Sequence, residues 1–327
     1  MGGNWNMLGH GWAVDLLRQQ VVGGTTRQAY LFTGPSGIGR RTLAQRFAQT
    51  LNCTAPPDPG VPCGDCWECR HIDEGTHPDV TVTQAATAGG ILKVGQAREV
   101  RGSLSLRPYR ARHRVAIFLR FQEANAEASN ALLKILEEPP PFAVLILTAD
   151  DPESILPTIV SRCEVLRLRP IPFEMVQQSL MQRGAREPVA QLISHLSAGC
   201  PGAALRMLED ETALPFRDQK LDELRSLLEG SRAEKFAYAH QISRDKGAMS
   251  SVLAVWLSFW RDVLWRSAGA ASPLSNPDRT EEIDALAARF GLPVARRQVD
   301  ILDGALQRLE TNVNPRLLAE VLLLDLP

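Results

Sequence analysis

The sequence lacks a surplus of positive charge. Its 36 lysine and arginine residues are balanced by 37 aspartate and glutamate residues, so the formal net charge is −1. Domains that bind DNA on their own are usually basic, because they must neutralise phosphates. The composition therefore excludes an overall basic DNA-binding protein. Any contact with nucleic acid is expected to be local or shared with partner proteins.

Long apolar stretches are missing as well. A helix that crosses a membrane needs about 18 consecutive apolar residues, and no such run occurs. The N-terminal segment MGGNWNMLGHGW has no basic region followed by an apolar one, so it does not resemble a signal peptide. We therefore expect a cytoplasmic protein that makes no contact with membranes.

Cysteine is scarce, with six residues in a chain of 327. This number is too small for a disulfide framework. Four of the six cluster in the spacing C-x9-C-x2-C-x2-C, namely Cys53, Cys63, Cys66 and Cys69. Four thiolates around one ion are typical of a structural zinc site. We expect the other two, Cys163 and Cys200, to be small buried apolar residues.

Other interpretations of the cysteine cluster stay open. The four thiols could be unligated, one C-x-x-C pair could have a redox role, and His71 or His77 could replace a cysteine as ligand. We favour four cysteine ligands, with both histidines as surface or packing residues. A further alternative is a zinc module that binds nucleic acid. The near-neutral charge of the protein and the presence of a single cysteine cluster argue against it.

The chain is longer than a usual single domain and changes character along its length. Up to residue 169, apolar strand-like segments alternate with helical patterns, and this order predicts a parallel sheet covered on both faces. The expected strands are Ala29–Phe32, a short one around Val80 and Val82, Arg114–Leu119 and Ala143–Ala149. After Arg169 only helical periodicity remains, broken at 198–203 and 267–277. We predict an α/β domain over 1–169, a small helical domain over 170–210 and an all-α domain over 211–327.

The segment GPSGIGRR keeps the turn of a phosphate-binding loop without its chemical side chains. A working loop has the pattern G-x-x-x-x-G-K-[ST], in which Lys reaches phosphate and Ser or Thr ligates magnesium. Gly34, Gly37 and Gly39 provide the turn, whereas Arg40 replaces the lysine and Arg41 replaces the hydroxyl. An arginine fits a tight loop differently from lysine, and it cannot ligate a cation at the second position.

A second defect lies at the end of the strand RVAIFL. Phosphate-loop ATPases carry acidic residues there to hold magnesium and position water, but this strand continues through Leu119 into Arg120. We therefore expect no ATP hydrolysis by this chain. Nucleotide binding without turnover stays open, because the loop amides and Arg40 remain. The alternative is an active ATPase motor, in which Arg40 substitutes for lysine and another acid replaces those missing near Leu119.

Four segments carry a specific resemblance in their order and spacing: AYLFTGPSGIGRRTLA, PCGDCWECRHIDEGTHPD, ASNALLKILEEPP and ILPTIVSRC. They resemble the delta-prime subunits of the bacterial DNA polymerase III clamp loader, which are members of the AAA+ superfamily. The resemblance implies a phosphate-loop sheet with an inserted zinc knuckle, a small helical lid domain and a helical collar domain for oligomerisation. It also implies a complex with ATPase gamma/tau subunits and a delta subunit, located at the replisome. The sliding clamp and primer-template DNA would be reached through that complex.

The resemblance also assigns roles to single residues. Arg162, with Ser161 before it, matches the arginine that reaches the ATP site of a neighbouring subunit and stabilises transferred phosphate. Thr148 matches a position that senses the γ-phosphate, or it caps its strand. Gly202 stands where active relatives carry an arginine in the small domain. At the C-terminus, Leu302, Leu306 and Leu309 recur at helical spacing, as an oligomer contact or as an ordinary core.

Overall fold

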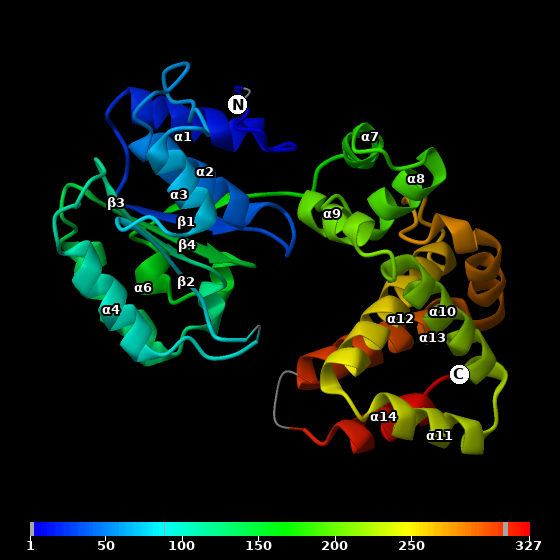
Figure 1. Ribbon diagram of the computed structural model, residues 1–327. Helices are drawn as coiled ribbons and strands as arrows, with labels where there is room; N and C mark the ends of the chain where they lie inside the picture. Colours follow the sequence, from blue (N-terminus) through cyan, green and yellow to red (C-terminus); the bar gives the residue numbers. More distant parts are fainter. Residues whose placement is uncertain (1–2, 88, 310–312) are drawn as a thin grey trace. The chain divides into compact units, whose positions relative to one another are not determined.

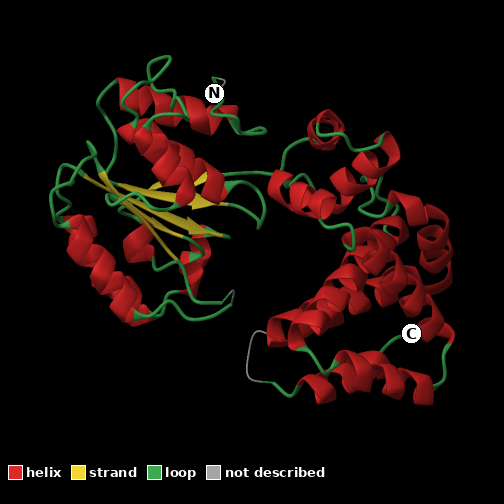
Figure 2. Cartoon of the chain, viewed as in Figure 1, coloured by secondary structure: helices red, strands yellow, loops and turns green. Residues whose placement is uncertain are grey.

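The computed structural model describes residues 3–87, 89–309 and 313–327. The chain divides into two compact units: one extends to Ser179 and includes Gly199–Ala203, and the other contains the remaining residues from Leu180 onward. In the described part of the chain, all strands lie in the first unit (Figure 2). The division into three domains at 169 and 210 stays a prediction.

The first unit is built on a five-stranded parallel sheet in the order β2-β3-β4-β1-β5 (Figure 1). Its strands are β1 (Ala29–Thr33), β2 (Val80–Thr83), β3 (Arg114–Phe118), β4 (Ala143–Ala149) and β5 (Glu164–Arg167). The four predicted strands are confirmed. We did not predict β5, because its four residues, EVLR, are too short and too polar to give a clear apolar signal.

Helices cover both faces of the sheet, as the near-continuous apolar strands require. One face packs against α1 (Gly11–Val22), α2 (Arg40–Asn52) and α3 (Trp67–Glu74), and the other against α4 (Val94–Leu104), α5 (Ala126–Glu137) and α6 (Pro157–Val160). Side chains alternate along β1, so Tyr30 and Phe32 enter the first core and Leu31 enters the second. Short 3₁₀ turns are η1 (Phe121–Glu123) and η2 (Pro152–Ser154).

The rest of the chain is helical, as predicted. Its elements are α7 (Phe173–Gln182), α8 (Glu187–Leu196), α9 (Pro201–Glu209), α10 (Ala213–Glu229), α11 (Arg232–Ile242), α12 (Lys246–Ser267), η3 (Pro277–Arg279), α13 (Thr280–Leu309) and α14 (Pro315–Leu324). The core of the second unit is centred on α12, where Trp256 and Trp260 are fully buried. Within α13, Gly291 leaves the helical conformation with φ of 68°, two residues before Pro293, so the helix kinks there.

The Gly/Ser/Pro-rich break at 267–277 is present and is tied to the helices around it. Both carboxylate oxygens of the buried Asp262 accept backbone N–H groups, at 2.9 Å from Ser275 and 2.8 Å from Asn276. Arg217, on α10, donates to the side-chain oxygen of Asn276 and to Asp278. This connection is therefore an ordered part of the unit rather than a loose linker.

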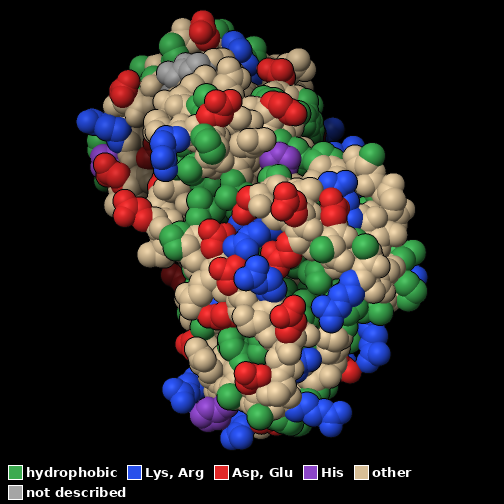
Figure 3. Space-filling model, turned by 90° about the vertical axis from the view of Figure 1, so that its right-hand side faces the viewer, with side chains coloured by type: hydrophobic (Ala, Val, Ile, Leu, Met, Phe, Trp, Pro, Cys, Tyr) green, Lys and Arg blue, Asp and Glu red, His purple; other side chains and the backbone are tan. Residues whose placement is uncertain are grey.

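The surface agrees with the near-neutral composition. Figure 3 shows acidic and basic side chains interspersed over the face that it draws. Among the described residues, none of the helices has the length and apolar character needed to cross a membrane.

Candidate functional site

The glycine-rich turn connects β1 to α2, where the sequence placed it. Gly34 has φ of 141°, and a Cβ atom there would lie 2.5 Å from the carbonyl oxygen of Leu168. Gly37 and Gly39 also have positive φ, at 81° and 112°. These positions suit glycine because a side chain would clash or strain the backbone.

Arg40 is buried and turned toward the end of a neighbouring strand. Its side chain is 9% exposed, and Nη2 lies 2.6 Å from Oδ1 of Asp150, directly after β4. Asp150 also accepts a hydrogen bond from Gln122 at 2.8 Å, and its backbone carbonyl accepts the N–H of Gly34. The charge that a phosphate would meet is thus already balanced by a carboxylate of the same chain.

The end of β3 holds an arginine in place of an acid. Leu119 is buried in the core, and Arg120, in the left-handed conformation, donates its Nε–H to Glu123 at 2.7 Å. The backbone N–H of Arg120 donates to the hydroxyl of Thr148 at 3.1 Å. This hydrogen bond agrees with the interpretation that Thr148 caps its strand. The acids at these strand ends, Glu123 and Asp150, are therefore both paired with arginines.

Gly202 lies directly against the glycine-rich turn. Its backbone N–H donates to the carbonyl oxygen of Gly37 at 2.7 Å, and a Cβ atom at Gly202 would lie 2.9 Å from that oxygen. An arginine in this backbone position would need the turn to move away. Close backbone contact with the turn therefore favours glycine at this position.

We did not foresee two residues at this site from the sequence. His10 is buried with its Nε2 3.0 Å from the carbonyl oxygen of Ile38, and burial lowers the pKa of its imidazole. The second residue that we did not foresee is Asp150, the partner of Arg40. Neither has a local sequence signal, because each becomes part of the site through contacts between segments that are distant in the sequence.

Arg162 lies at the opposite edge of the sheet. It follows α6 and precedes β5, beside the start of β1, whereas the glycine-rich turn follows the end of β1. The two sites are thus separated by about the length of a five-residue strand, on the order of 15 Å. Arg162 is therefore placed away from the chain's own phosphate loop.

Two contacts hold the guanidinium of Arg162 while leaving it accessible. Nη1 donates to the carbonyl oxygen of Thr158 at 2.8 Å, and Nη2 donates to Glu137 at 2.9 Å, with 37% of the side chain exposed. A pocket of about 550 Å³ opens beside it, lined also by Ser161 and Arg27. The guanidinium has five N–H donors, so several remain for an outside ligand.

Of the two isolated cysteines, one is buried as expected and the other only in part. Cys200 is buried in the core beside α2, and Cys163 is partly buried against the other core. Burial raises the pKa of the Cys163 thiol to about 12. A thiol that stays protonated is a poor nucleophile, which agrees with a packing role for Cys163.

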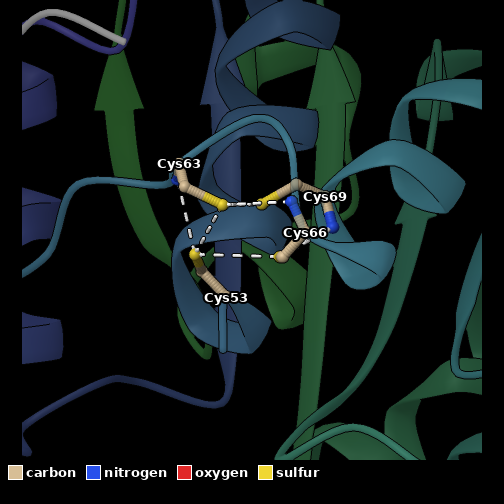
Figure 4. Close-up of side chains that lie close together, drawn as sticks. All are labelled: Cys53, Cys63, Cys66 and Cys69. Carbon is tan, nitrogen blue, oxygen red and sulfur yellow. Dashed lines mark hydrogen bonds between the residues drawn. The ribbon is translucent and has the colours of Figure 1, made fainter. Parts of the chain in front are cut away.

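The structure brings the four clustered cysteines together, as predicted. The Sγ atom of Cys53 lies 3.5 Å from that of Cys63 and 4.0 Å from that of Cys66, and Cys63 and Cys69 are 3.9 Å apart (Figure 4). All four sulfur atoms lie within 4.8 Å of one another, so the cluster could hold one metal ion. Neither His71 nor His77 joins this group of ligands in the described residues.

Backbone N–H groups point at the sulfur atoms. Those of Cys63, Cys66 and Cys69 donate to the sulfurs of Cys53, Cys63 and Cys66 at 3.3, 3.2 and 3.4 Å. Burial opposes ionisation of Cys66, but hydrogen bonds involving Thr54 and Cys69 outweigh it and lower the pKa of that thiol to about 6. Burial raises the pKa of Cys53 and Cys69. A cation among the four sulfurs would favour the thiolate form of all of them.

The two nearby histidines support the cluster as packing residues. His77 is buried with its Nε2 2.5 Å from a carboxylate oxygen of Glu68, a residue of α3 that lies between Cys66 and Cys69 in the sequence. His71 stacks on Trp67, with ring centroids 3.8 Å apart. These contacts fix α3, which carries Cys69 and is capped by Cys66.

The sheet order, the glycine-rich turn before α2 and the helical C-terminal region define an AAA+ module. The solved structure of a DNA polymerase III gamma subunit-related protein from Thermotoga maritima has a TM-score of 0.50 and 17% identity, covering 95% of this chain and 97% of that one. At this identity the likeness concerns the fold alone. The predicted fold class is confirmed.

Sequence comparison gives the family. The family described as DNA polymerase III, delta subunit, matches residues 9–172, and its C-terminal counterpart matches residues 214–327. The chain therefore belongs to the DNA polymerase III delta subunit family, and the predicted delta-prime type is confirmed by its relatives.

Two curated relatives are delta-prime subunits of DNA polymerase III. The one from Pseudomonas aeruginosa is 36% identical over 182 residues, 55% of this chain and 55% of the relative, so the match spans about half of that protein. The one from Bacillus subtilis is 26% identical over 317 residues, 96% of this chain and 94% of the relative. Relatives also include tau and gamma/tau subunits of DNA polymerase III.

Proposed function

We propose that this chain is a clamp-loader subunit that does not hydrolyse ATP itself and completes the ATP site of a neighbouring gamma/tau subunit with Arg162. In this role it helps the complex, which also contains a delta subunit, to load the sliding clamp onto primer-template DNA in the cytoplasm. The observation that carries the proposal is the position of Arg162, accessible beside a pocket and at the edge of the sheet opposite the glycine-rich turn.

The chain's own nucleotide site supports the first half of the proposal. Arg40 is neutralised by Asp150, Arg120 after β3 is paired with Glu123, and Gly202 packs on the turn. Hydrolysis needs a magnesium ligand and a residue that positions water, in addition to phosphate contacts. Arg41 and the end of β3 lack the residue types for the first two, and Arg40 is already paired, so a single compensating residue would not restore hydrolysis.

The contacts of Arg162 support the second half. An arginine supplied in trans must extend beyond its own subunit and be held in one orientation before the phosphoryl group transfers. Thr158 and Glu137 hold two of its nitrogens, and the adjacent pocket also contains Arg27. We propose that Arg162 acts as this arginine, with Ser161 beside it.

We further propose that the four cysteines hold a structural zinc ion. Zinc binds thiolates at about 2.3 Å in a tetrahedron, which places the sulfurs about 3.8 Å apart. The three sulfur–sulfur separations of 3.5, 3.9 and 4.0 Å fit this geometry. Four sulfur ligands leave no open coordination position, so the role of the ion would be to fix the segment between α2 and α3.

We propose that the C-terminal helices take part in assembly of the complex. The residues that would do so differ from the leucines considered in the sequence analysis. Leu302 and Leu309 are buried in the core, and Leu306 packs against it. On α14, in contrast, Leu317, Val321 and Leu324 are all exposed at helical spacing. We propose that this stripe lies within a collar domain over 211–327, after an AAA+ domain over 1–169 and a lid over 170–210.

The test uses the complex reconstituted from this chain with its cognate gamma/tau and delta subunits. Arg162→Ala should leave the mass of the complex unchanged and lower DNA-stimulated ATP turnover at the site that it serves by about tenfold or more. Arg167→Ala, which removes an exposed arginine from β5, is the matched control and should retain turnover. Equal turnover of the Arg162→Ala complex and the parent complex would contradict the proposal that Arg162 acts at the ATP site of a neighbouring subunit.

A further inference from the structure

The segment that connects α4 to β3 concentrates basic and aromatic side chains. Residues 105–114, SLRPYRARHR, contain four arginines and no acidic residue in a protein whose overall charge is near zero. We refer to residues 105–113 as the arginine loop. Within it, Leu106 is 61% exposed and Tyr109 is 86% exposed, so both large side chains point into solvent.

A buried carboxylate holds the arginine loop in place. Asp79, which is 1% exposed, accepts the backbone N–H of Tyr109 at 2.7 Å, of Arg110 at 2.8 Å and of Ala111 at 2.9 Å. The side-chain oxygen of the buried Asn52 accepts the N–H of His113 at 2.9 Å. Four backbone amides of the loop are thus fixed by buried side chains, and the loop presents its own side chains from an ordered backbone.

The anchoring charges are balanced within the protein. Nη1 of Arg114 lies 3.5 Å from Asp79 and donates to the carbonyl oxygen of Arg107 at 3.1 Å. Arg110 lies over the ring of Trp67 at 4.1 Å and donates to the buried Glu68 at 2.8 Å, which joins the loop to the cysteine cluster. Asp79 and Glu68 are therefore already neutralised.

Two arginines of the loop are left for an outside partner. Arg107 and Arg112 are exposed, and in the described part of the chain no acidic side chain pairs with either guanidinium. They flank Tyr109 in the sequence, so the exposed ring and the two arginines belong to the same short surface segment. The surface carries positive charge and an aromatic ring at the same place.

The arginine loop is distant from the nucleotide site. It leads into the first residue of β3, and Asp79 directly precedes β2, so it lies at the amino-terminal edge of the parallel sheet. The glycine-rich turn lies at the carboxyl-terminal edge, after β1. A function of this loop therefore does not depend on ATP or on the trans role of Arg162.

We propose that the arginine loop binds single-stranded nucleic acid, with Arg107 and Arg112 on phosphates and Tyr109 stacked on a base. Proteins that bind single strands combine backbone-tracking positive charge with aromatic rings on which bases stack. An acidic peptide could also pair with the two arginines. However, the side chains of a peptide gain most of their binding energy in closed pockets. A ring exposed as fully as Tyr109 offers an open face, which suits a base better than a peptide side chain.

The test measures binding of a fluorescent oligothymidylate to the purified full-length chain by anisotropy, over a range of salt concentrations. Arg107→Ala with Arg112→Ala should weaken binding at low salt about tenfold and reduce the salt slope by roughly 1.4, because each arginine that neutralises a phosphate contributes about 0.7 to it. Tyr109→Ala should weaken binding about fivefold or more with little change in the slope. The control is Arg183→Ala with Arg244→Ala, two exposed arginines outside the loop, which should bind like the parent.

Each alternative result counts against the proposal. Absence of binding by the parent, or equally weakened binding by the loop and control variants, shows that the loop is not a nucleic-acid site. Displacement of the oligonucleotide by polyglutamate at similar concentration, together with an unchanged Tyr109→Ala variant, identifies an acidic peptide partner instead and overturns it. Thermal melts of all variants separate loss of binding from loss of folding. Because the substituted side chains are exposed, we expect all variants to melt like the parent.

Discussion

Arg40 and Asp150 form an ion pair between the phosphate-binding turn and the end of the adjacent strand, with Nη2 2.6 Å from Oδ1. Arg40 is the first residue of α2, and Asp150 directly follows β4, which pairs with β1. In a working phosphate loop, the cation at this position contacts the phosphates of the nucleotide. Here a carboxylate of the same chain lies against that cation.

The pair should contribute to stability in a double-mutant cycle. Asp150→Ala should lower the free energy of unfolding by about 1–2 kcal/mol, because it leaves the buried Arg40 without its acid, although Asp150 is itself half exposed. Arg40→Met should remove most of that cost when it is combined with Asp150→Ala, giving a coupling energy of about 1 kcal/mol in urea denaturation. The exposed pair Arg167 and Glu153 is the control, with coupling below about 0.5 kcal/mol. Equal coupling in the two pairs would show that burial of Arg40 adds nothing.

The cysteine cluster should bind metal and couple it to folding. We expect elemental analysis to find about one zinc ion per chain, and Cys66→Ser or chelation to lower the melting temperature, because ligation energy becomes folding energy. Cys163→Ser, which changes a cysteine outside the cluster, should keep the metal. A metal-free protein that melts at the same temperature as the parent would contradict the zinc assignment.

Arg217 should be important for the stability of the helical unit. Its side chain is 6% exposed and bonds both Asn276 and Asp278, which fix the connection before α13. Arg217→Ala should cost about 2–4 kcal/mol, because it leaves the buried amide of Asn276 and a carboxylate without their donor. Arg225→Ala, at an exposed position of α10, should change stability by less than about 0.5 kcal/mol. Chemical denaturation followed by tryptophan fluorescence reports both units, because Trp5 lies in the core of the first and Trp256 and Trp260 lie in the core of the second, so the variant should shift only the transition of the helical unit.

Stability should fall as the pH decreases just below neutrality. Burial lowers the pKa of His10 and His113 in the folded state, so the unfolded chain binds more protons in the window below the ordinary value near 6.5. Stability is therefore complete above about pH 6.5 and is lost as the pH falls through the lowered values. Asp79 and Glu223 also have lowered pKa values and add losses of the same sign at more acidic pH.

The contribution of His10 is measured as a difference between variants, which cancels the protonation of the cysteine cluster. His10→Gln should lose less stability than the parent between about pH 7 and pH 5, because a neutral amide replaces the imidazole that must ionise. His240→Gln, at an exposed position, should follow the parent. Parallel melting curves for His10→Gln and the parent would remove the role of His10.

Much of the first unit could be predicted from local patterns. Apolar strands such as Ala143–Ala149, the glycine-rich turn and the spacing of the cysteines each depend on residues that are close in the sequence. β5 was missed because four mixed residues give too little signal, and it becomes a strand only through pairing with β1. Likewise, helical spacing could not distinguish a core position such as Leu302 from an exposed one such as Leu317, because periodicity marks a face without saying what covers it.

The sequence by itself determined which side chains stand at the phosphate-loop positions, since Arg40 and Arg41 occupy the places of lysine and a hydroxyl, and Leu119 that of an acid. It also determined the four cysteines whose spacing predicts a zinc site. Only the tertiary structure decided which partners these side chains meet. Asp150 reaches Arg40, and Asp79 supports the arginine loop, because parallel strands bring together segments that are distant in the sequence. Burial then fixes the cost of breaking each contact, and burial is a property of the fold and not of any local pattern.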